Sequence, residues 1–175
     1  VDILEIGTPC IKHNGIKLLE TLKAKFPNNL VLVDLKTMDA GEYESEPFYK
    51  AGADICTVLG ASGIATIKGV IAAAKKYGKE CQVDMINVDD KEALAKEAVA
   101  AGADIISGGT GADVLSGFGQ ADIITGGAGD DTIKGGDETA LTGVGDNLSG
   151  GSGADIIDGN AGDDTIDGGD GADII

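Results

Sequence analysis

Residues 150–175 have the sequence GGSGADIIDGNAGDDTIDGGDGADII, which is built from a nine-residue unit. Each unit has glycine at the first and fourth places and mostly at the second, aspartate at the sixth and a large aliphatic residue at the eighth. The unit also occurs upstream, as GGTGADVLS (108–116), GFGQADIIT (117–125) and GGAGDDTIK (126–134). Glycines at these three places permit a tight loop with positive φ, and residues seven to nine form a short strand whose eighth side chain points inward. Repetition at a fixed phase predicts a parallel β-roll with two units per turn.

One irregular stretch, residues 135–149, interrupts the repeat. Treating residues 137–142 (DETALT) as an insertion restores the phase. The sixth-place aspartates are then Asp113, Asp122, Asp131, Asp146, Asp155, Asp164 and Asp173. The inward aliphatic residues are Leu115, Ile124, Ile133, Leu148, Ile157, Ile166 and Ile175. The expected stacked pairs are Asp113 with Asp131, Asp122 with Asp146, Asp131 with Asp155, Asp146 with Asp164, and Asp155 with Asp173.

The repeat offers a metal only oxygen ligands, from the sixth-place aspartates and the loop carbonyls. Flexible loops with hard oxygen ligands select Ca²⁺ over Zn²⁺ or Cu²⁺ and over the stricter Mg²⁺. The pattern resembles the RTX calcium-binding repeat, which implies that these seven aspartates bind Ca²⁺. The unit at 117–125 lacks two of its glycines, so we expect the poorest sites near Asp122.

Energetics indicate that the β-roll needs its metal. Each unit buries one aliphatic side chain, worth about 2 kcal/mol, against an ordering cost of about 1 kcal/mol or more for each residue. Residues 105–175 also carry 14 acidic residues against one lysine, Lys134. We therefore expect this part to be disordered without Ca²⁺ and to fold on binding it. A glycine-rich acidic linker is the alternative, but a linker has no reason to repeat Ile or Leu at a fixed period.

The formal net charge of −17 limits the possible partners. A surface this acidic repels phosphate backbones and anionic lipid, which argues against nucleic acid and membrane surfaces and in favour of cations. No apolar stretch has the length of a membrane span, and no charged-then-apolar leader opens the chain. Location stays open: cytoplasmic as the chain stands, extracellular if the repeats determine it.

The first part of the chain has a different pattern. Short β-branched runs alternate with helical patterns, which predicts right-handed βαβ units on a parallel sheet. We therefore expect an incomplete β/α barrel-like domain over 1–104 and a β-roll over 105–175. Cys10, Cys56 and Cys81 adjoin apolar runs and are predicted to be buried free thiols. The expected strands are 1–7, 29–36, 53–60 and 81–88, and the expected helices are 14–26, 41–52, 61–79 and 89–102.

Charged residues gather where these strands end. Asp34 and Lys36 fall on one face of the expected strand in LVLVDLKTMD, Asp39 follows in the loop, and Glu5 has the equivalent place one strand earlier. Chemistry in parallel sheets gathers at the carboxyl ends of the strands. These four residues are therefore a candidate site for a cation or an anionic substrate.

The same residues carry a family resemblance. VDILEIGTP (1–9), LVLVDLKTMDAGEYE (30–44), AGADICTVLG (51–60) and VDMINVDDK (83–91) resemble hexulose-6-phosphate synthase, of the orotidine-monophosphate-decarboxylase group of (β/α)8 barrels. The resemblance implies that Glu5 and Asp34 bind Mg²⁺, which stabilises an enediolate of ribulose 5-phosphate that adds to formaldehyde. It also implies that Lys36 and Asp39 complete the catalytic cluster, Asp39 across a dimer interface.

The chain departs from that family in ways that bear on activity. It begins after a family strand that ends in a functional Asp, it has Gly109-Thr110-Gly111 where the family has His-Thr-Gly, and the last two phosphate-binding strands have no counterpart. His13, in an expected polar loop, is predicted to be solvated. We therefore expect a calcium-binding module joined to an inactive synthase-like part, with a carbon–carbon lyase as the alternative. A chimera, a designed sequence or a gene-fusion fragment would explain the combination, and open sheet edges predict self-association.

Overall fold

The computed structural model describes residues 3–117, 121–136 and 145–175, and the chain divides into two compact units, Val1–Val83 and Asp84–Ile175. The insertion predicted at 137–142 lies outside the described residues. Among the residues that the structure describes, no helix is both long and apolar enough to cross a membrane.

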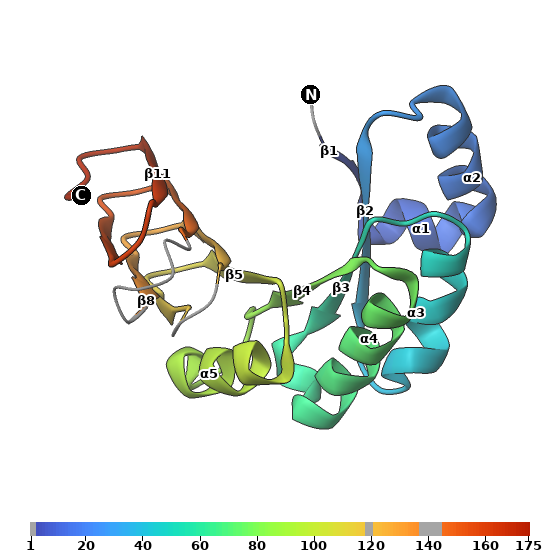
Figure 1. Cartoon of the computed structure of the whole chain (residues 1–175), viewed down its shortest axis with the longest axis horizontal. Coiled ribbons are helices and arrows are strands. Elements are labelled where there is room, and N and C mark those ends of the chain that lie inside the picture. The colour runs from blue at the N-terminus through green and yellow to red at the C-terminus, as the bar shows by residue number, and fades with distance from the viewer. Residues whose placement is uncertain (1–2, 118–120, 137–144) are drawn as a thin grey trace. The chain divides into compact units, whose positions relative to one another are not determined.

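The first unit is a set of parallel β/α units (Figure 1). Its strands lie in the order β1, β2, β3, β4, and its helices pack against one face of the sheet. Val31, Val33, Cys56 and Leu19 are fully buried between sheet and helices. The elements are β1 (Ile3–Ile6), α1 (Thr8–Asn14), α2 (Ile16–Lys25), β2 (Leu30–Thr37), α3 (Gly41–Lys50), β3 (Ile55–Leu59), a 3-10 turn η1 (Gly60–Ser62), α4 (Ile64–Tyr77) and β4 (Glu80–Asp84).

The predicted strand and helix order is confirmed, with one helix added. The helix expected over 14–26 is α2, and the added helix, α1, precedes it; Gly15, with a φ of 62°, separates the two. His13 therefore lies in the last turn of α1 and not in a loop, although it is exposed as predicted. Gly78 ends α4 in the left-handed conformation, which glycine adopts readily.

The cysteine prediction is partly wrong. Cys56 and Cys81 are buried free thiols, and burial raises the pKa of Cys56 to about 12. Cys10 is exposed, because it lies on the outer side of α1, the helix that the sequence pattern did not predict.

Asp54, which precedes β3, holds a buried ion-pair cluster. Its carboxylate accepts hydrogen bonds from Lys23 Nζ at 2.7 Å, from Lys79 Nζ at 2.5 Å and from the Val31 backbone N–H at 2.8 Å. Burial by itself raises the pKa of Asp54, but the two lysines and the backbone donor outweigh it and hold the pKa below its usual value. The cluster ties α2, β2 and β4 to β3.

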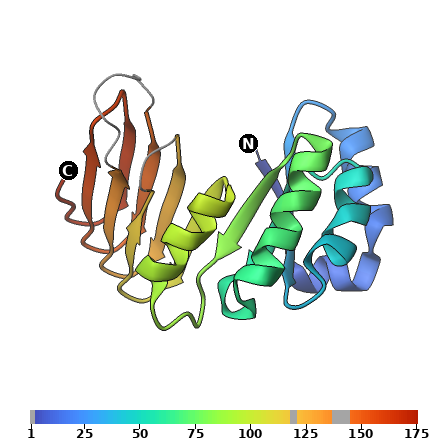
Figure 2. The ribbon, with the colours of Figure 1, turned by 60° about the horizontal axis from the view of Figure 1, so that its bottom comes forward.

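The second unit begins with α5 (Lys91–Ala101) and continues as the predicted β-roll (Figure 2). One parallel sheet has the order β5, β7, β9, β11, and the other has the order β10, β8, β6. Asp90 caps α5 by accepting the Ala93 N–H, and Gly102 ends it in the left-handed conformation. The strands are β5 (Ile105–Thr110), β6 (Val114–Ser116), β7 (Ile123–Ala128), β8 (Thr132–Gly136), β9 (Asn147–Ser152), β10 (Ile156–Asn160) and β11 (Thr165–Asp170).

The register of the β-roll confirms the phase of the repeat. Asp113 stacks on the residue 18 positions later, whereas Asp122 and Asp131 stack on residues 24 positions later. The six extra positions match the predicted insertion. Each pair of strands on either side of residues 137–142 has the longer spacing, so the register is the same in the two sheets.

The inward ladder of aliphatic side chains is confirmed for most of its length. Leu115, Ile124, Ile133 and Leu148 are fully buried and Ile157 is 2% exposed. The prediction is wrong at the last two places, because Ile166 is partly exposed and Ile175 is 70% exposed. The last described strands have a stacked neighbour on one side only, whereas β6 at the other end, which carries the buried Leu115, also contacts α5.

We predict that Asp54→Asn lowers the free energy of unfolding of the first unit by roughly 1.5–3 kcal/mol, the range for hydrogen bonds to charged groups. The lowered pKa gives stability that is present above the unfolded-state pKa of about 4 and lost as the pH falls through the folded value. Urea unfolding followed by helical circular dichroism measures both effects. Glu20→Gln, which breaks the exposed Lys17–Glu20 pair, is the control and should change little. Equal effects of the two variants would contradict the assignment.

Candidate metal centre

The sixth-place aspartates stack into two ladders, one on each side of the β-roll. The first ladder consists of Asp113, Asp131, Asp155 and Asp173, and the second of Asp122, Asp146 and Asp164. In both, the backbone N–H of one aspartate donates to Oδ1 of the aspartate in the next turn, at 2.8–3.0 Å. All five predicted stacking pairs are confirmed.

The second carboxylate oxygen of these aspartates has a different environment. Oδ2 is buried and accepts no hydrogen bond in Asp113, Asp131, Asp146 and Asp155. Burying an acceptor of a charged group without a donor is unfavourable by several kcal/mol in order of magnitude. A bound cation would give such an oxygen a partner.

First-place glycines lie directly against these oxygens. A Cβ added at Gly126 would meet Asp131 Oδ2 and the Gly150 carbonyl oxygen of the next turn, and a Cβ at Gly150 would meet Asp155 Oδ2 and the Gly168 carbonyl. Two oxygen acceptors therefore converge on the small space that the missing side chain leaves. Main-chain carbonyls and carboxylates around such a space are ligands suited to Ca²⁺.

The first glycine of the repeat thus has another role from the one predicted. Positive φ occurs at the second place, as in Gly127 (118°) and Gly151 (106°), and at the fourth, as in Gly129 (126°). Among the described residues, none of the first-place glycines has a positive φ. Glycine is needed there for a different reason, because the aspartate lies so close that a side chain would not fit. Asn160 replaces glycine at one second place and adopts a φ of 63°, which asparagine tolerates better than most residues.

Electrostatics within the ladders oppose the ionised state. Burial, the main cause, and the neighbouring Asp113 and Asp155 raise the pKa of Asp131. Burial and Asp164 raise the pKa of Asp146 in the same way. A bound divalent cation would remove both penalties, because it favours the charged form of each carboxylate.

No compact carboxylate cage accompanies the ladders. Among the described residues, no group of three or more His, Cys, Asp or Glu side chains could hold a metal ion. Any ion in the β-roll must therefore combine carboxylate oxygens with loop carbonyls, as the glycine contacts suggest. This is the combination of aspartate carboxylates and loop carbonyls that the sequence of the repeat predicts.

In the first unit, the structure brings two of the four predicted residues together. Lys36 Nζ lies 3.3 Å from Asp34 Oδ1, even though Lys36 has a φ of 47° at a register irregularity of β2 and the simple alternation of strand faces does not extend to it. Glu5 and Asp39 are exposed, and the Asp39 carboxylate accepts the Ala40 N–H at 2.5 Å.

The Asp34 carboxylate already has a full set of donors. Thr57 Oγ1 donates to Oδ1 at 2.8 Å, and the Thr8 hydroxyl and backbone N–H donate to Oδ2 at 2.5 and 3.3 Å. Burial raises the pKa of Asp34, but the hydrogen bonds from Thr8 and Thr57 and the Lys36 charge outweigh it and lower the pKa overall. This arrangement does not fit Mg²⁺, because Asp34 offers the ion no oxygen without a donor.

The sequence did not predict a role for two threonines and one lysine that contact the candidate sites. Thr8 and Thr57 bind Asp34 from α1 and β3, and only the fold shows that these strand-end hydroxyls face the same carboxylate. Lys91 contacts the first ladder, where its Nζ donates to the Gly108 carbonyl oxygen at 3.0 Å. A lysine in the first turn of a helix, where acidic residues are favoured, was the available signal.

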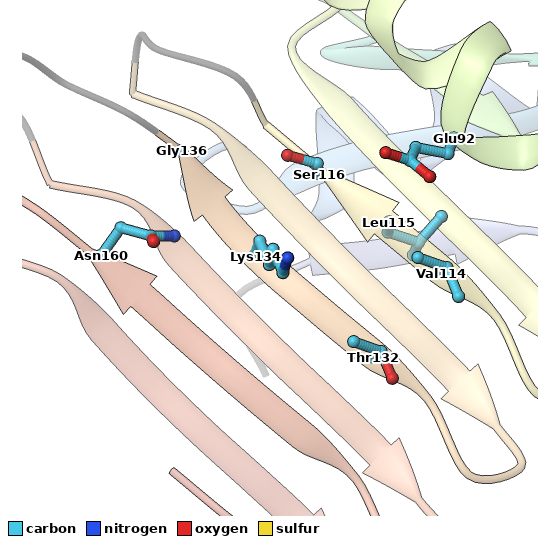
Figure 3. A pocket seen from close by; sticks show the side chains of 8 residues that line it. All are labelled: Glu92, Val114, Leu115, Ser116, Thr132, Lys134, Gly136 and Asn160. Atoms are coloured by element: carbon cyan, nitrogen blue, oxygen red, sulfur yellow. The ribbon is translucent and has the colours of Figure 1, made fainter.

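A shallow pocket of about 320 Å³ lies on the outer face of the three-stranded sheet (Figure 3). Its polar side chains come from Glu92 of α5, Ser116 of β6, Thr132 and Lys134 of β8, and Asn160 of β10. None of the sixth-place aspartates lines it. The pocket is therefore separate from the two ladders.

The parallel β/α units and the strand-end polar cluster of the first unit place it in the class of (β/α)8-barrel folds. The sequence model of the orotidine 5'-phosphate decarboxylase / HUMPS family matches residues 1–157, and the chain belongs to that family. The model of the RTX calcium-binding nonapeptide repeat matches residues 141–175. The three earlier units lie outside that second match, but they have the same strand register and aspartate stacking.

Individual relatives match the first 60% of the chain. The 3-hexulose-6-phosphate synthase of Methylomonas aminofaciens is 76% identical over 106 residues, 61% of this chain and 51% of that protein. The synthase of Bacillus subtilis is 52% identical over 106 residues, 61% and 50% of the two chains. The crystal structure of the Salmonella typhimurium synthase matches with 45% identity and a TM-score of 0.59, covering 61% of this chain and 51% of that one. The chain spans about half the length of the curated relatives it matches.

We predict that Asp131→Asn weakens calcium binding about tenfold or more, since the loss of one ligand charge is worth at least about 1.4 kcal/mol. Asparagine keeps the Oδ1 acceptor for the Asp113 N–H, so the fold of the turn is preserved. The matched control is Asp130→Asn at the neighbouring exposed place, which keeps the acceptor for the Ala154 N–H. Titration calorimetry with Ca²⁺ measures the difference. Equal losses in the two variants would mean that net charge, and not the ladder, determines affinity.

Proposed function

We propose that the chain is a calcium-binding module whose β-roll binds Ca²⁺ between successive loops through the seven sixth-place aspartates and first-place glycine carbonyls. The observation that carries the proposal is the row of buried Oδ2 atoms that accept no hydrogen bond in four of these aspartates. The match of the RTX repeat model to residues 141–175 supports the identity of the ion.

Folding of the β-roll then depends on the ion. The aliphatic core of the β-roll is one side chain per unit, and its acidic residues outnumber its lysine 14 to one over 105–175. Buried carboxylates close to one another repel, as the raised pKa values of Asp131 and Asp146 indicate. Binding free energy from the metal would therefore be folding free energy.

Circular dichroism with and without Ca²⁺ tests this proposal. We expect the β signal to increase when Ca²⁺ replaces EDTA, with calcium uptake by calorimetry over the same concentration range, and a much smaller response to Mg²⁺, which prefers octahedral geometry. The helical signal of the first unit should stay constant and serves as the internal control. A chain with no gain of β signal and no calcium uptake would contradict the proposal.

We further propose that the synthase-like part has no aldol activity in this chain, although its relatives are 3-hexulose-6-phosphate synthases. Asp34 and Lys36 are in contact, which favours the alternative of an active lyase. Against it, the donors from Thr8 and Thr57 occupy the oxygens of Asp34 that Mg²⁺ would need. By resemblance, Gly109-Thr110-Gly111 also has glycine where the family has a functional histidine.

An assay with Mg²⁺, ribulose 5-phosphate and formaldehyde distinguishes the two candidates. We expect no consumption of formaldehyde above the rate without protein. Turnover that disappears in Asp34→Ala, with Asp104→Ala as the exposed-carboxylate control, would instead establish the lyase. In that case Glu5, Lys36 and Asp39 would be the next positions to substitute.

A further inference from the structure

Lys91, the first residue of α5, forms an ion pair with Asp113, the first aspartate of the first ladder. Its Nζ pairs with Asp113 Oδ1 and donates to the Gly108 carbonyl oxygen at 3.0 Å. The side chains are 16% exposed for Lys91 and 3% for Asp113. A lysine is rarely this buried unless it is paired.

The place of this contact in the first ladder is specific. Oδ1 of Asp131 and of Asp155 accepts a backbone N–H from the aspartate of the preceding turn. Asp113 is the first member of the ladder, and its Oδ1 accepts the Lys91 ammonium instead. The donor that a preceding turn supplies elsewhere is here a side chain of α5.

The contact of Lys91 with the Gly108 carbonyl oxygen also corresponds to a contact made in the later turns. Gly108 is a first-place glycine, and its counterparts Gly126 and Gly150 direct their carbonyl oxygens at the glycine and aspartate Oδ2 of the turn before them. The Gly108 carbonyl has the Lys91 ammonium in that position. One positive group therefore contacts the two kinds of oxygen, sixth-place carboxylate and first-place carbonyl, that the β-roll offers to a cation.

We propose that Lys91 is a built-in cation at the Asp113 end of the first ladder: its ammonium gives Oδ1 of Asp113 the donor that a preceding turn supplies elsewhere, and it leaves Oδ2 of Asp113 to Ca²⁺. The inference rests on the proposed calcium function of the β-roll. At Asp113 the chain itself compensates part of the negative charge of the ladder, and the ion compensates the rest. The packing of α5 on β6 places the ammonium beside this end of the ladder.

The position of Lys91 in its helix supports a role in the ladder. A positive charge in the first turn of a helix is unfavourable with respect to the helix dipole, and the last turn of α5, where a lysine would be favourable, has no basic residue. Lys91 is thus placed against the preference of its own helix. The contact with Asp113 and Gly108 supplies the compensating interaction.

Lys91→Met tests the proposal in the full chain, since methionine keeps the apolar stem and removes the charge. A circular-dichroism titration gives the calcium concentration at half-maximal β signal. We expect the midpoint to rise about tenfold or more, because Asp113 and Gly108 lose their cation. Lys96→Met, an exposed lysine of the same helix, is the matched control and should shift the midpoint less than about twofold, as expected for an exposed charge.

Further outcomes separate this inference from the calcium proposal. If the wild-type chain does not respond to calcium, the proposed function itself fails. If the wild type responds and Lys91→Met titrates like Lys96→Met, the proposed role of Lys91 is wrong and the calcium function stands. Should Lys91→Met not reach the wild-type signal at saturating calcium, Lys91→Arg decides: recovery of the signal supports a required cation, and no recovery overturns it.

Discussion

The β-roll depends on one unfavourable arrangement, a column of aspartates in which the buried carboxylates of Asp113, Asp131, Asp146 and Asp155 each have one oxygen with a donor and one without. Oδ1 accepts a backbone N–H from the neighbouring turn, so it fixes the spacing between turns. Oδ2 lies against a glycine and a carbonyl oxygen and accepts no hydrogen bond in Asp131 and Asp155. The backbone geometry that stacks the turns is therefore the geometry that concentrates negative charge, and a bound cation would stabilise both together.

The two units rely on different physical terms. The first buries large aliphatic side chains between a parallel sheet and its helices, and its buried carboxylates, Asp34 and Asp54, already have lysine and hydroxyl or amide donors. The second has one aliphatic side chain per unit and raised carboxylate pKa values. Burial of apolar side chains stabilises the first unit, whereas under the proposed calcium function the second gains stability from charge compensation outside the repeat. Lys91 provides such compensation from within the chain at one position.

Much of this organisation follows from the sequence. The nine-residue period predicted the strands, the stacking pairs and the six-residue change of phase, because a solenoid converts sequence period directly into register. The β/α order of the first unit was predicted from alternating hydrophobic patterns. Other features required the fold: Thr8 and Thr57 are distant in sequence from Asp34, and a helix over 8–14 is too short to give a clear hydrophobic period.

The different roles of the three glycine positions in the repeat also become visible only in the folded structure. In the sequence, the first, second and fourth glycines look alike, whereas in the structure two supply positive φ and the other gives room to a carboxylate and a carbonyl. The exposure of Ile175 likewise depends on which turns have neighbours. The local sequence pattern shows where glycine and aliphatic residues recur. The packing of successive turns determines which glycines have positive φ and which aliphatic side chains are buried.

Amide hydrogen exchange of the ladder aspartates, measured at pH 7 in EDTA and in saturating Ca²⁺, tests the account most directly. The backbone N–H groups of Asp113, Asp131 and Asp155 donate to the next turn, so their exchange reports whether the turns are stacked. If calcium stabilises the stacked turns, these amides are strongly protected from exchange in calcium and little protected in EDTA, while amides of β2 and β3 are protected equally in both. Equal protection of the ladder amides with and without calcium would contradict it.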